Sequence, residues 1–324
     1  MRAILCKQYG PPQTLTVENL SSPVPGPNQV LIRVCAAGVN FPDTLIIQNL
    51  YQFKPPLPFS PGGEFSGDII ALGAEVSHLK IGQRVTAFTG WGAFAEEVAA
   101  DADRVMPIPD NMPFDLAACF VMTYGTSYHA LKDRAGLKSG ESLLVLGAAG
   151  GVGLAAVEIG KTMGARVIAA ASSDAKLEVC RQHGADEVIN YDTENLRERI
   201  KALTGGKGVD VVYDPVGGAY SEPALRSIAW RGRFLVVGFA AGTIPSIPLN
   251  LALLKGLSIC GVFWGEFIKR EPQGNARDLA ELLALLQAGK ITPLISARYS
   301  FDQVAEALNS VLERKAVGKI VLIP

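Results

Sequence analysis

The residues best suited to chemistry lie near the middle of the chain, in the glycine-rich stretch Gly147–Gly153. The apolar run Ser142–Leu146 precedes this stretch and helix-forming residues follow it. A strand that turns sharply into a helix points the first amides of the helix at an anion, and glycines let that backbone approach a pyrophosphate. In the G-x-G-x-x-G fingerprint the first glycine is replaced, and Gly147, one position earlier, is expected to supply the missing conformational freedom. The pattern predicts a dinucleotide site at Ala148, Gly150, Gly151, Val152 and Gly153.

The end of the next expected strand, Arg166–Ala171, indicates which dinucleotide binds. NAD enzymes usually place an acid there to bind the ribose 2′-hydroxyl. In this chain small neutral residues end the strand, and Asp174 lies beyond them, where it is expected to cap the next helix. Ser172, Lys176 and Tyr191 are candidate ligands of a 2′-phosphate, although a surface lysine and a loop tyrosine are the simpler interpretation. The sequence therefore favours NADP(H), and Asp174 becomes the ribose ligand if NAD binds instead.

The elements around these residues fall into two regions with different periodicities. The first 122 residues contain the β-branched runs Gln29–Ala36, Gly67–Leu72 and Arg84–Phe88, separated by proline and glycine clusters, which is typical of a small barrel-like β domain. From about residue 123, buried strands alternate with helices, which predicts a parallel, doubly wound sheet. The expected strands are Ser142–Leu146, Arg166–Ala171, Glu187–Asn190, Val209–Tyr213, Arg233–Gly238 and Leu257–Val262, and the expected helices are Val152–Met163, Asp174–His183, Glu194–Leu203 and Glu222–Trp230.

The tail after Val262 changes pattern again. It contains two amphipathic helices, Asp278–Gln287 and Gln303–Glu313, and a closing strand, Lys319–Ile323. The tail is too short to fold alone, so we expect it to pack on the N-terminal domain. The predicted organisation is a catalytic domain formed by residues 1–122 with 264–324, a nucleotide domain formed by residues 123–263, and a cleft between them.

The composition excludes several classes of protein. The chain has 324 residues, enough for about two domains, and its 30 basic and 31 acidic residues argue against a protein that mainly binds nucleic acid or anionic lipid. The uncharged run Phe234–Leu254 contains glycine, proline and asparagine, which favours a buried strand and a loop over a membrane helix. Five scattered cysteines and the absence of a signal-peptide pattern in Met1–Lys7 predict a cytoplasmic protein.

Five stretches spread over almost the whole chain resemble the zinc-free quinone oxidoreductases. These relatives of zeta-crystallin belong to the medium-chain dehydrogenase/reductase superfamily. The resemblance implies an α/β protein with a doubly wound parallel Rossmann sheet and a GroES-like β-barrel catalytic domain. The stretches that carry it are Gly38–Asp43, Pro61–Gly67, Ala148–Gly153, Val188–Tyr191 and Gly318–Leu322.

The ligands of a catalytic zinc ion are missing from the expected places. Zinc alcohol dehydrogenases of this superfamily carry a cysteine in the loop after the early strand and a histidine in a Gly-His-Glu motif. This chain has Asn40 in a loop without cysteine, glycine at position 63, and no four-cysteine structural lobe. Its histidines, His78, His129 and His183, lack ligand spacing and are expected on the surface or on helix sides. We therefore expect no metal, and without a Lewis acid alcohol oxidation is disfavoured.

The expected reaction is hydride transfer from NADPH to a quinone or to the β-carbon of an α,β-unsaturated carbonyl. Conjugation spreads the negative charge in such acceptors, so orientation and one or two hydrogen-bond donors suffice. By resemblance, Asn40 and Tyr51 are those donors. The alternatives are a loop cap for Asn40 and a half-buried wall residue for Tyr51. Many relatives carry another tyrosine six residues earlier, where this chain has Leu45, which implies a more apolar pocket.

Seven further residues are expected at the cofactor. One glycine and the phenylalanine after it follow from their position at the carboxyl end of an expected parallel strand. The others follow from the resemblance, and the lysine among them has a solvated position as its alternative. These residues are Thr123, Thr126, Gly238, Phe239, Phe263, Trp264 and Lys319.

Two other functions and one assembly state remain as expectations. An enoyl-thioester or acryloyl-CoA reductase would use the same chemistry, and Lys269, Arg270 and Arg277 hint at a basic channel for its carrier. A non-catalytic NADPH-binding protein, structural or RNA-binding, is disfavoured by the neutral charge. The apolar edge strand Leu257–Phe263 is expected to pair with its symmetry mate in a homodimer, unless a helix covers it.

Overall fold

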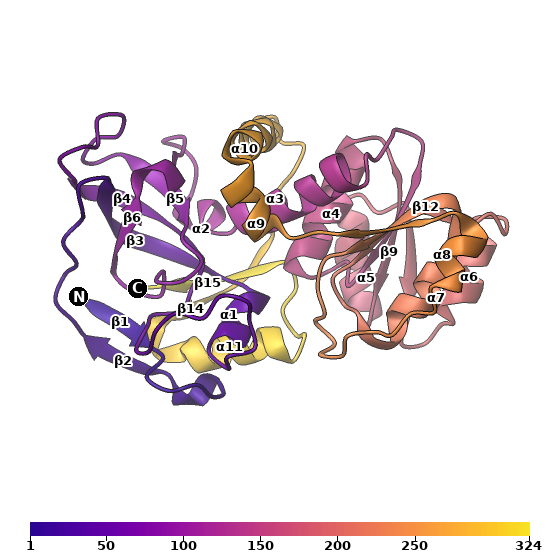
Figure 1. Ribbon diagram of the computed structural model, residues 1–324, viewed down its shortest axis with the longest axis horizontal. Helices are drawn as coiled ribbons and strands as arrows, with labels where there is room; N and C mark the ends of the chain where they lie inside the picture. Colours follow the sequence, from indigo (N-terminus) through magenta and orange to yellow (C-terminus); the bar gives the residue numbers. More distant parts are fainter. The chain divides into compact units, whose positions relative to one another are not determined.

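The computed structural model describes residues 1–324, and the chain divides into two compact units. The first unit contains Met1–Met122 and Pro293–Pro324, and the second contains Thr123–Thr292. In Figure 1 the first unit combines the indigo and purple start of the chain with its yellow end.

The first unit is built mainly from strands. A seven-stranded sheet runs in the order β14-β15-β3-β4-β5-β7, and β6 also pairs with β3. A separate two-stranded sheet contains β1 and β2. The elements are β1 Arg2–Leu5, β2 Thr16–Asn19, β3 Gln29–Val39, α1 Phe41–Ile46, β4 Glu64–Leu72, β5 Arg84–Phe88, β6 Glu97–Asp101, β7 Val105–Pro107, α2 Phe114–Ala117, β14 Ile295–Ser300, α11 Val304–Leu312 and β15 Lys319–Ile323.

The central strand β3 has eleven residues, and eight of them are buried. It pairs with β4 so closely that a Cβ atom on Gly67 would lie 1.9 Å from the carbonyl oxygen of Arg33. Glycine at this position therefore allows the two backbones to meet. The core beneath includes Ile32, Phe65 and Phe94.

The end of the chain completes this first unit. Strand β15 pairs antiparallel with β3, with Ile320 opposite Val39, and parallel with β14. Helix α11 contributes Ala307 and Leu308 to the same core. The closing strand has the bounds that the sequence predicts, whereas β14 was not expected. Its residues alternate only between half-buried and exposed, so its apolar pattern is weak.

Residues 264–292 group with the second unit, although the sequence interpretation assigned them to the catalytic domain. They form α9 (Trp264–Arg270) and α10 (Pro272–Gln287). The Nζ atom of Lys132 lies 2.9 Å from an oxygen of Asp278 and 2.6 Å from an oxygen of Glu281. These ion pairs hold α10 in the second unit, so the chain returns to the first unit at Pro293 and not at residue 264.

The second unit contains a six-stranded sheet in the order β10-β9-β8-β11-β12-β13, and every neighbouring pair is parallel. In chain order this is 3-2-1-4-5-6, the arrangement of dinucleotide-binding sheets. The predicted doubly wound sheet is confirmed. The other elements are α3 Val121–His129, β8 Ser142–Leu146, α4 Gly151–Thr162, β9 Arg166–Ala171, α5 Asp174–Gln182, β10 Glu187–Asn190, α6 Leu196–Leu203, β11 Val209–Asp214, α7 Ser221–Arg226, β12 Ile228–Val236, α8 Asn250–Lys255 and β13 Ser258–Gly261.

One expected helix is too long, because α7 ends at Arg226 and β12 begins at Ile228. Between Ile228 and Arg233 the pairing with β11 shifts its register. Arg231 takes a φ angle of +62°, and a Cβ atom on Gly232 would lie 2.3 Å from the Ile228 side chain. Because of this irregularity, the start of β12 does not show the alternating pattern of a strand and was not predicted.

The uncharged run that begins at Phe234 contains the end of β12, a loop and the start of α8. The strand and the loop agree with the expectation, whereas the short helix α8 was not expected. Among the helices of the chain, not one combines the length and the apolar character needed to cross a membrane.

Candidate functional site

Asn40 and Lys319 meet in a buried polar cluster of the first unit. Asn40 follows β3, and Lys319 begins β15, the strand that pairs with β3. The ammonium of Lys319 donates to the carbonyl oxygen of Val39 at 3.0 Å, to Oε1 of Glu64 at 2.9 Å and to Oδ1 of Asn40. Glu64 is fully buried and Lys319 is 4% exposed. The solvated alternative for Lys319 is therefore wrong.

The carboxamide of Asn40 is bonded on both sides. Its Oδ1 accepts from Lys319, and its Nδ2 donates to Oε1 of Glu64 at 3.0 Å and to the carbonyl oxygen of Gly38 at 3.4 Å. The residue is the N-cap of α1, and its backbone N–H donates to Oδ2 of Asp43 at 2.7 Å. This geometry matches the loop-cap interpretation, and a role for Asn40 as a substrate donor stays a prediction.

Glu64 and Asp43 complete the cluster, and neither was singled out from the sequence. The second carboxylate oxygen of Glu64 accepts from the backbone N–H of Met122 at 2.9 Å. A signal for them exists in Lys319, which opens an apolar closing strand. A lysine buried in such a strand requires a carboxylate partner inside the protein.

Asp43, within this cluster, and Tyr51 both have raised pKa values. Burial raises the pKa of the Asp43 carboxyl from 3.8 to about 7, against the lowering effect of the Asn40 backbone N–H. Burial, with a smaller contribution from the charge of Asp43, raises the pKa of Tyr51 to about 12. The Tyr51 ring lies edge-on to Phe53, with 5.6 Å between ring centroids. Its phenol therefore keeps its proton at neutral pH and can act as a hydrogen-bond donor.

In the second unit, the glycine-rich turn joins β8 to α4. Gly147 takes a φ angle of +57°, in the left-handed region that favours glycine. This is the freedom expected of it in place of the missing first glycine. Gly150 is the N-cap of α4, and a Cβ atom on it would make only an ordinary contact, 3.4 Å from the Gly147 carbonyl oxygen.

Gly153 has a different task in the same turn. A Cβ atom there would lie 2.3 Å from the carbonyl oxygen of Gly147. Glycine at 153 therefore lets the first turn of α4 pack on the end of β8, while the amides around Gly150 and Gly151 remain at the start of the helix. The twelve-residue helix α4 thus presents its positive end at the carboxyl edge of the sheet.

Two of the three residues predicted for a 2′-phosphate follow neighbouring strands on this edge, and the third, Lys176, lies in the first turn of α5. Ser172 follows β9, and Nζ of Lys176 donates to its hydroxyl at 3.2 Å. Tyr191 follows β10, and its backbone N–H donates to the carbonyl oxygen of Ala171 at 3.1 Å. The Tyr191 ring packs on Tyr220, with 4.3 Å between ring centroids. The structure therefore brings Ser172 and Lys176 together, with Tyr191 on the adjoining strand end.

The expected helix cap at Asp174 is wrong. Ser173 is the N-cap of α5, and its hydroxyl accepts from the backbone N–H of Lys176. The carboxylate of Asp174 instead accepts from Nδ2 of Asn190 at 2.9 Å. A serine directly before the acid satisfies the same helix end, so the sequence offered two equivalent caps.

Asp214 is a further residue of this edge that the sequence interpretation missed. Its Oδ1 accepts from the backbone N–H groups of Val216 and Gly217, each at 2.8 Å, and its Oδ2 accepts from the hydroxyl of Ser221 at 2.5 Å. Burial raises the pKa of this carboxyl. The Asp214 carbonyl oxygen accepts from Gly238, which places the predicted Gly238–Phe239 segment beside the end of β11. An acid ending an apolar strand was the available signal.

The residues of α3 and α9 that are predicted to contact the cofactor lie around Gly125. Trp264 is buried, and a Cβ atom on Gly125 would lie 3.0 Å from its indole. Gly125 lies between Thr123, which is buried, and Thr126, which is half-buried. Phe263, immediately before the helix, is exposed. Trp264 therefore packs against the helix that carries both predicted threonines.

His129, Asp133 and Asp278 also form a cluster. Asp278 is far from the other two along the chain, so the sequence did not indicate this cluster. Their ligand-type atoms lie within 4.8 Å of one another, and Nδ1 of His129 is 2.7 Å from Oδ2 of Asp133. The ammonium of Lys132 bonds to both Asp278 and Glu281. Lys132 thus supplies the positive charge that these acids require, and the group forms an ion-pair network.

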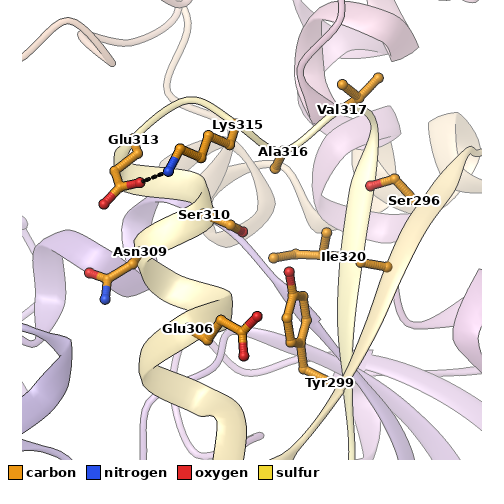
Figure 2. A pocket seen from close by; sticks show the side chains of 11 residues that line it. Ser296, Tyr299, Glu306, Asn309, Ser310, Glu313, Lys315, Ala316, Val317 and Ile320 are labelled. Carbon is orange, nitrogen blue, oxygen red and sulfur yellow. Dashed lines mark ion pairs between the residues drawn. The ribbon is translucent and has the colours of Figure 1, made fainter.

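A cavity of about 620 Å³ lies in the first unit, between α11 and the strands β14 and β15. Figure 2 shows Tyr299, Glu306 and Ile320 around it, with the exposed Glu313–Lys315 ion pair at one end. The residues predicted to carry the chemistry do not line it. Side chains alternate along a strand, so Ile320 lines this cavity while its neighbour Lys319 bonds to Asn40 and Glu64.

The residues of the polar cluster do not fit a zinc ion. Asn40 uses its carboxamide in protein hydrogen bonds, and Gly63 has no ligand to offer. The ammonium of Lys319, 2.9 Å from Glu64, would repel a second cation in the same place.

Two family models match the chain and define its class. Residues 26–110 match the alcohol dehydrogenase GroES-like domain, and residues 151–286 match the zinc-binding dehydrogenase model. Human quinone oxidoreductase is 36% identical over 326 residues, which cover 100% of this chain and 98% of that protein. Rat quinone oxidoreductase-like protein 2 is 38% identical over 322 residues, which cover 99% and 91%.

A solved structure agrees with these relatives. Escherichia coli quinone oxidoreductase complexed with NADPH superimposes with a TM-score of 0.94 at 30% identity, and 100% of each chain is covered. The chain belongs to the quinone oxidoreductase family of the medium-chain dehydrogenase/reductase superfamily. The predicted resemblance and fold class are confirmed.

Replacing Asp43 by asparagine is expected to change how stability depends on pH. Because the folded pKa is about 7 and the ordinary value is 3.8, the folded carboxyl holds a proton between these values that the unfolded chain has released. The contribution of Asp43 to the free energy of unfolding therefore falls as pH rises from about 4 to about 7, at up to about 1.4 kcal/mol per pH unit. Asp43→Asn should lack this fall.

Urea unfolding of both proteins between pH 4.5 and pH 8 measures the effect. The difference between the variant and the original protein should shift in favour of the variant over this range. The exposed Asp110, changed to asparagine, is the matched control and should follow the original protein. A difference that stays constant with pH would contradict the assignment.

Proposed function

We propose that this chain is an NADPH-dependent oxidoreductase that transfers hydride to quinones or other α,β-unsaturated carbonyls without a metal ion. One observation carries the proposal. The turn into α4 and the Lys176–Ser172 contact of 3.2 Å lie at the same edge of the sheet, where the carboxyl ends of β8 and β9 meet. The Escherichia coli relative and a mycobacterial protein of 31% identity are complexed with NADPH, which supports this cofactor. NADPH supplies the hydride.

The residues of the chain have separate tasks in this proposal. The amides at the start of α4 bind the pyrophosphate, and Lys176 with Ser172 binds the 2′-phosphate. Tyr51, whose phenol keeps its proton, donates to the oxygen on which negative charge develops. A conjugated acceptor needs no Lewis acid, which agrees with a cluster whose cation is Lys319.

An enoyl-thioester reductase is the second candidate. The CurK enoyl reductase superimposes with a TM-score of 0.90 at 27% identity, and its reaction class uses the same hydride chemistry. The basic segment that would favour an acyl carrier is partly neutralised, because Arg270 pairs with Glu266 at 2.8 Å. We therefore place quinones and enones first.

The deciding experiment follows NADPH oxidation with quinones, enones and enoyl-CoA esters, with and without a chelator. We expect turnover with a quinone or enone and an unchanged rate after chelation. Turnover with enoyl-CoA alone would favour the second candidate. NADPH binding without turnover of any acceptor would favour a non-catalytic protein. Activity that is lost to the chelator and restored by zinc would contradict the metal-free reaction.

NADPH preference is expected to depend on Lys176. A charge-assisted hydrogen bond contributes about 1.5–3 kcal/mol, less where water screens it, and 1.4 kcal/mol is tenfold in affinity. Lys176→Ala should therefore raise the Kd for NADPH about tenfold and leave the Kd for NADH within about twofold.

Isothermal titration with both cofactors measures this, and Lys207→Ala, at an exposed lysine of the same unit, is the control. Two effective contacts in the original protein correspond to a preference on the order of 100-fold. Equal catalytic efficiency with NADH and NADPH would overturn the assignment and make Asp174 the leading ribose ligand.

We also propose a homodimer that forms through β13. This strand ends the sheet and pairs with β12 alone, and Ile259 on it is exposed. Large apolar side chains of the same unit are also exposed, among them Trp230, Leu253 and Leu254. Strand pairing across a two-fold axis would remove the open edge of the sheet.

Light scattering at micromolar concentration should give twice the mass of the chain. Ile259→Lys should yield the monomer mass, because two lysines would meet in the paired edge. Ile81→Lys, at an exposed isoleucine of the first unit, should leave the dimer intact. A monomeric mass for the original protein would refute the proposal.

The proposed compartment is the cytoplasm. All five cysteines are free, and Cys6, Cys119 and Cys180 are buried. Buried free thiols support a reducing compartment.

A further inference from the structure

Every N–H donor of the Lys319 ammonium has an acceptor inside the first unit. An ammonium group carries three N–H donors, and Lys319 has three acceptors, on Val39, Asn40 and Glu64. The Lys319 side chain is 5% exposed and the Glu64 side chain is fully buried. A buried ion pair is stable only when its geometry is good and its remaining donors are bonded. Lys319 therefore has a fixed position.

The cation bonds to Asn40 and to Glu64, the residue that follows Gly63. Asn40 stands in the loop where the family resemblance expects the first ligand, and Gly63, which precedes Glu64, stands where it expects the second. A Cβ atom on Gly63 would lie 3.2 Å from the Phe88 ring. A side chain at this position would therefore move the Phe88 ring by a few tenths of an ångström.

The contacts of this cation continue toward the predicted site. The Asn40 carboxamide bonds to Lys319 and Glu64, and the Asn40 backbone caps α1 through Asp43. The turn after α1 is tied to it by the hydrogen bond from Leu50 N–H to the Leu45 carbonyl oxygen at 2.9 Å. Tyr51 is the next residue. The direction of α1 and the position of Tyr51 therefore depend on the orientation of Asn40.

We propose that Lys319 is a positioning residue, whose buried ammonium balances Glu64 and holds Asn40 so that the segment 40–51 has one conformation. The inference rests on the proposed function for its effect on turnover, but its effect on this segment is independent of it. Lys319 acts through Asn40 and α1 and binds no cofactor, because its three donors are already bonded.

The double variant Lys319→Met with Glu64→Gln tests this proposal. Removing one partner would leave an unpaired buried charge, whereas removing both charges keeps the shapes similar and is often tolerated. We expect the double variant to fold, to bind NADPH with a Kd within about twofold of the original, and to have a kcat at least about tenfold lower. Lys315→Met, at an exposed lysine of the same tail, is the matched control and should change neither quantity.

Hydrogen exchange distinguishes a positioning role from a general loss of stability, which would not be confined to residues 40–51. Amides of residues 40–51 should exchange at least about tenfold faster in the double variant, while amides of Thr123–Thr292 keep their rates. If the original protein turns over no acceptor, the proposed function fails, and the exchange measurement still decides the positioning role.

Three results would overturn the inference. The first is unchanged exchange in residues 40–51. The second is a kcat within twofold of the original in a protein shown to be active. The third is a Kd for NADPH raised more than about fivefold without faster exchange, which would assign Lys319 to the cofactor. If the double variant does not fold, Asn40→Ala replaces it, because it leaves Lys319 and Glu64 paired; faster exchange in residues 41–51 supports the proposal and unchanged exchange overturns it.

Discussion

The first unit depends on burying one ammonium group with all of its hydrogen bonds made. Lys319 and Asn40 come from opposite ends of the chain, and the antiparallel pairing of β15 with β3 brings them together. A shift of this pairing by one residue would turn the side chain at 319 to the other face and leave the buried Glu64 without its counter-charge. Strand register and charge balance therefore enforce one another, and they determine where α1 begins.

The second unit depends on a steric constraint. The left-handed conformation at Gly147 and the close approach of Gly153 to the Gly147 carbonyl oxygen bring α4 directly onto β8. The helix end then faces the same sheet edge as Ser172 and Lys176. Asp214 holds the next strand end by accepting backbone N–H groups. A rigid edge of this kind binds an anionic dinucleotide with little rearrangement, because its donors are already oriented.

The proposed reaction with a conjugated acceptor agrees with the groups that the first unit contains. A zinc ion polarises a carbonyl or an alkoxide directly, whereas the ammonium of Lys319 is paired with Glu64 and bonded to Val39 and Asn40. What the first unit offers is a protonated phenol at Tyr51 and a nearby carboxyl, Asp43, whose pKa is about 7. Such groups are adequate when the acceptor itself spreads the negative charge, as in a quinone or an enone.

Features that depend on a few adjacent residues are predictable from the amino-acid sequence. These include the turn at Gly147–Gly153, the strands β8, β9 and β10, and the family, because glycine patterns and apolar periodicity are local. Tertiary structure decided the rest. The Lys319–Glu64 pair joins segments that are far apart along the chain, and so does the Lys132–Asp278 pair that groups α10 with the second unit. The start of β12 is irregular and breaks the periodicity of the strand. Such pairs are selected by strand register and by the need to neutralise buried charge, which no local pattern encodes.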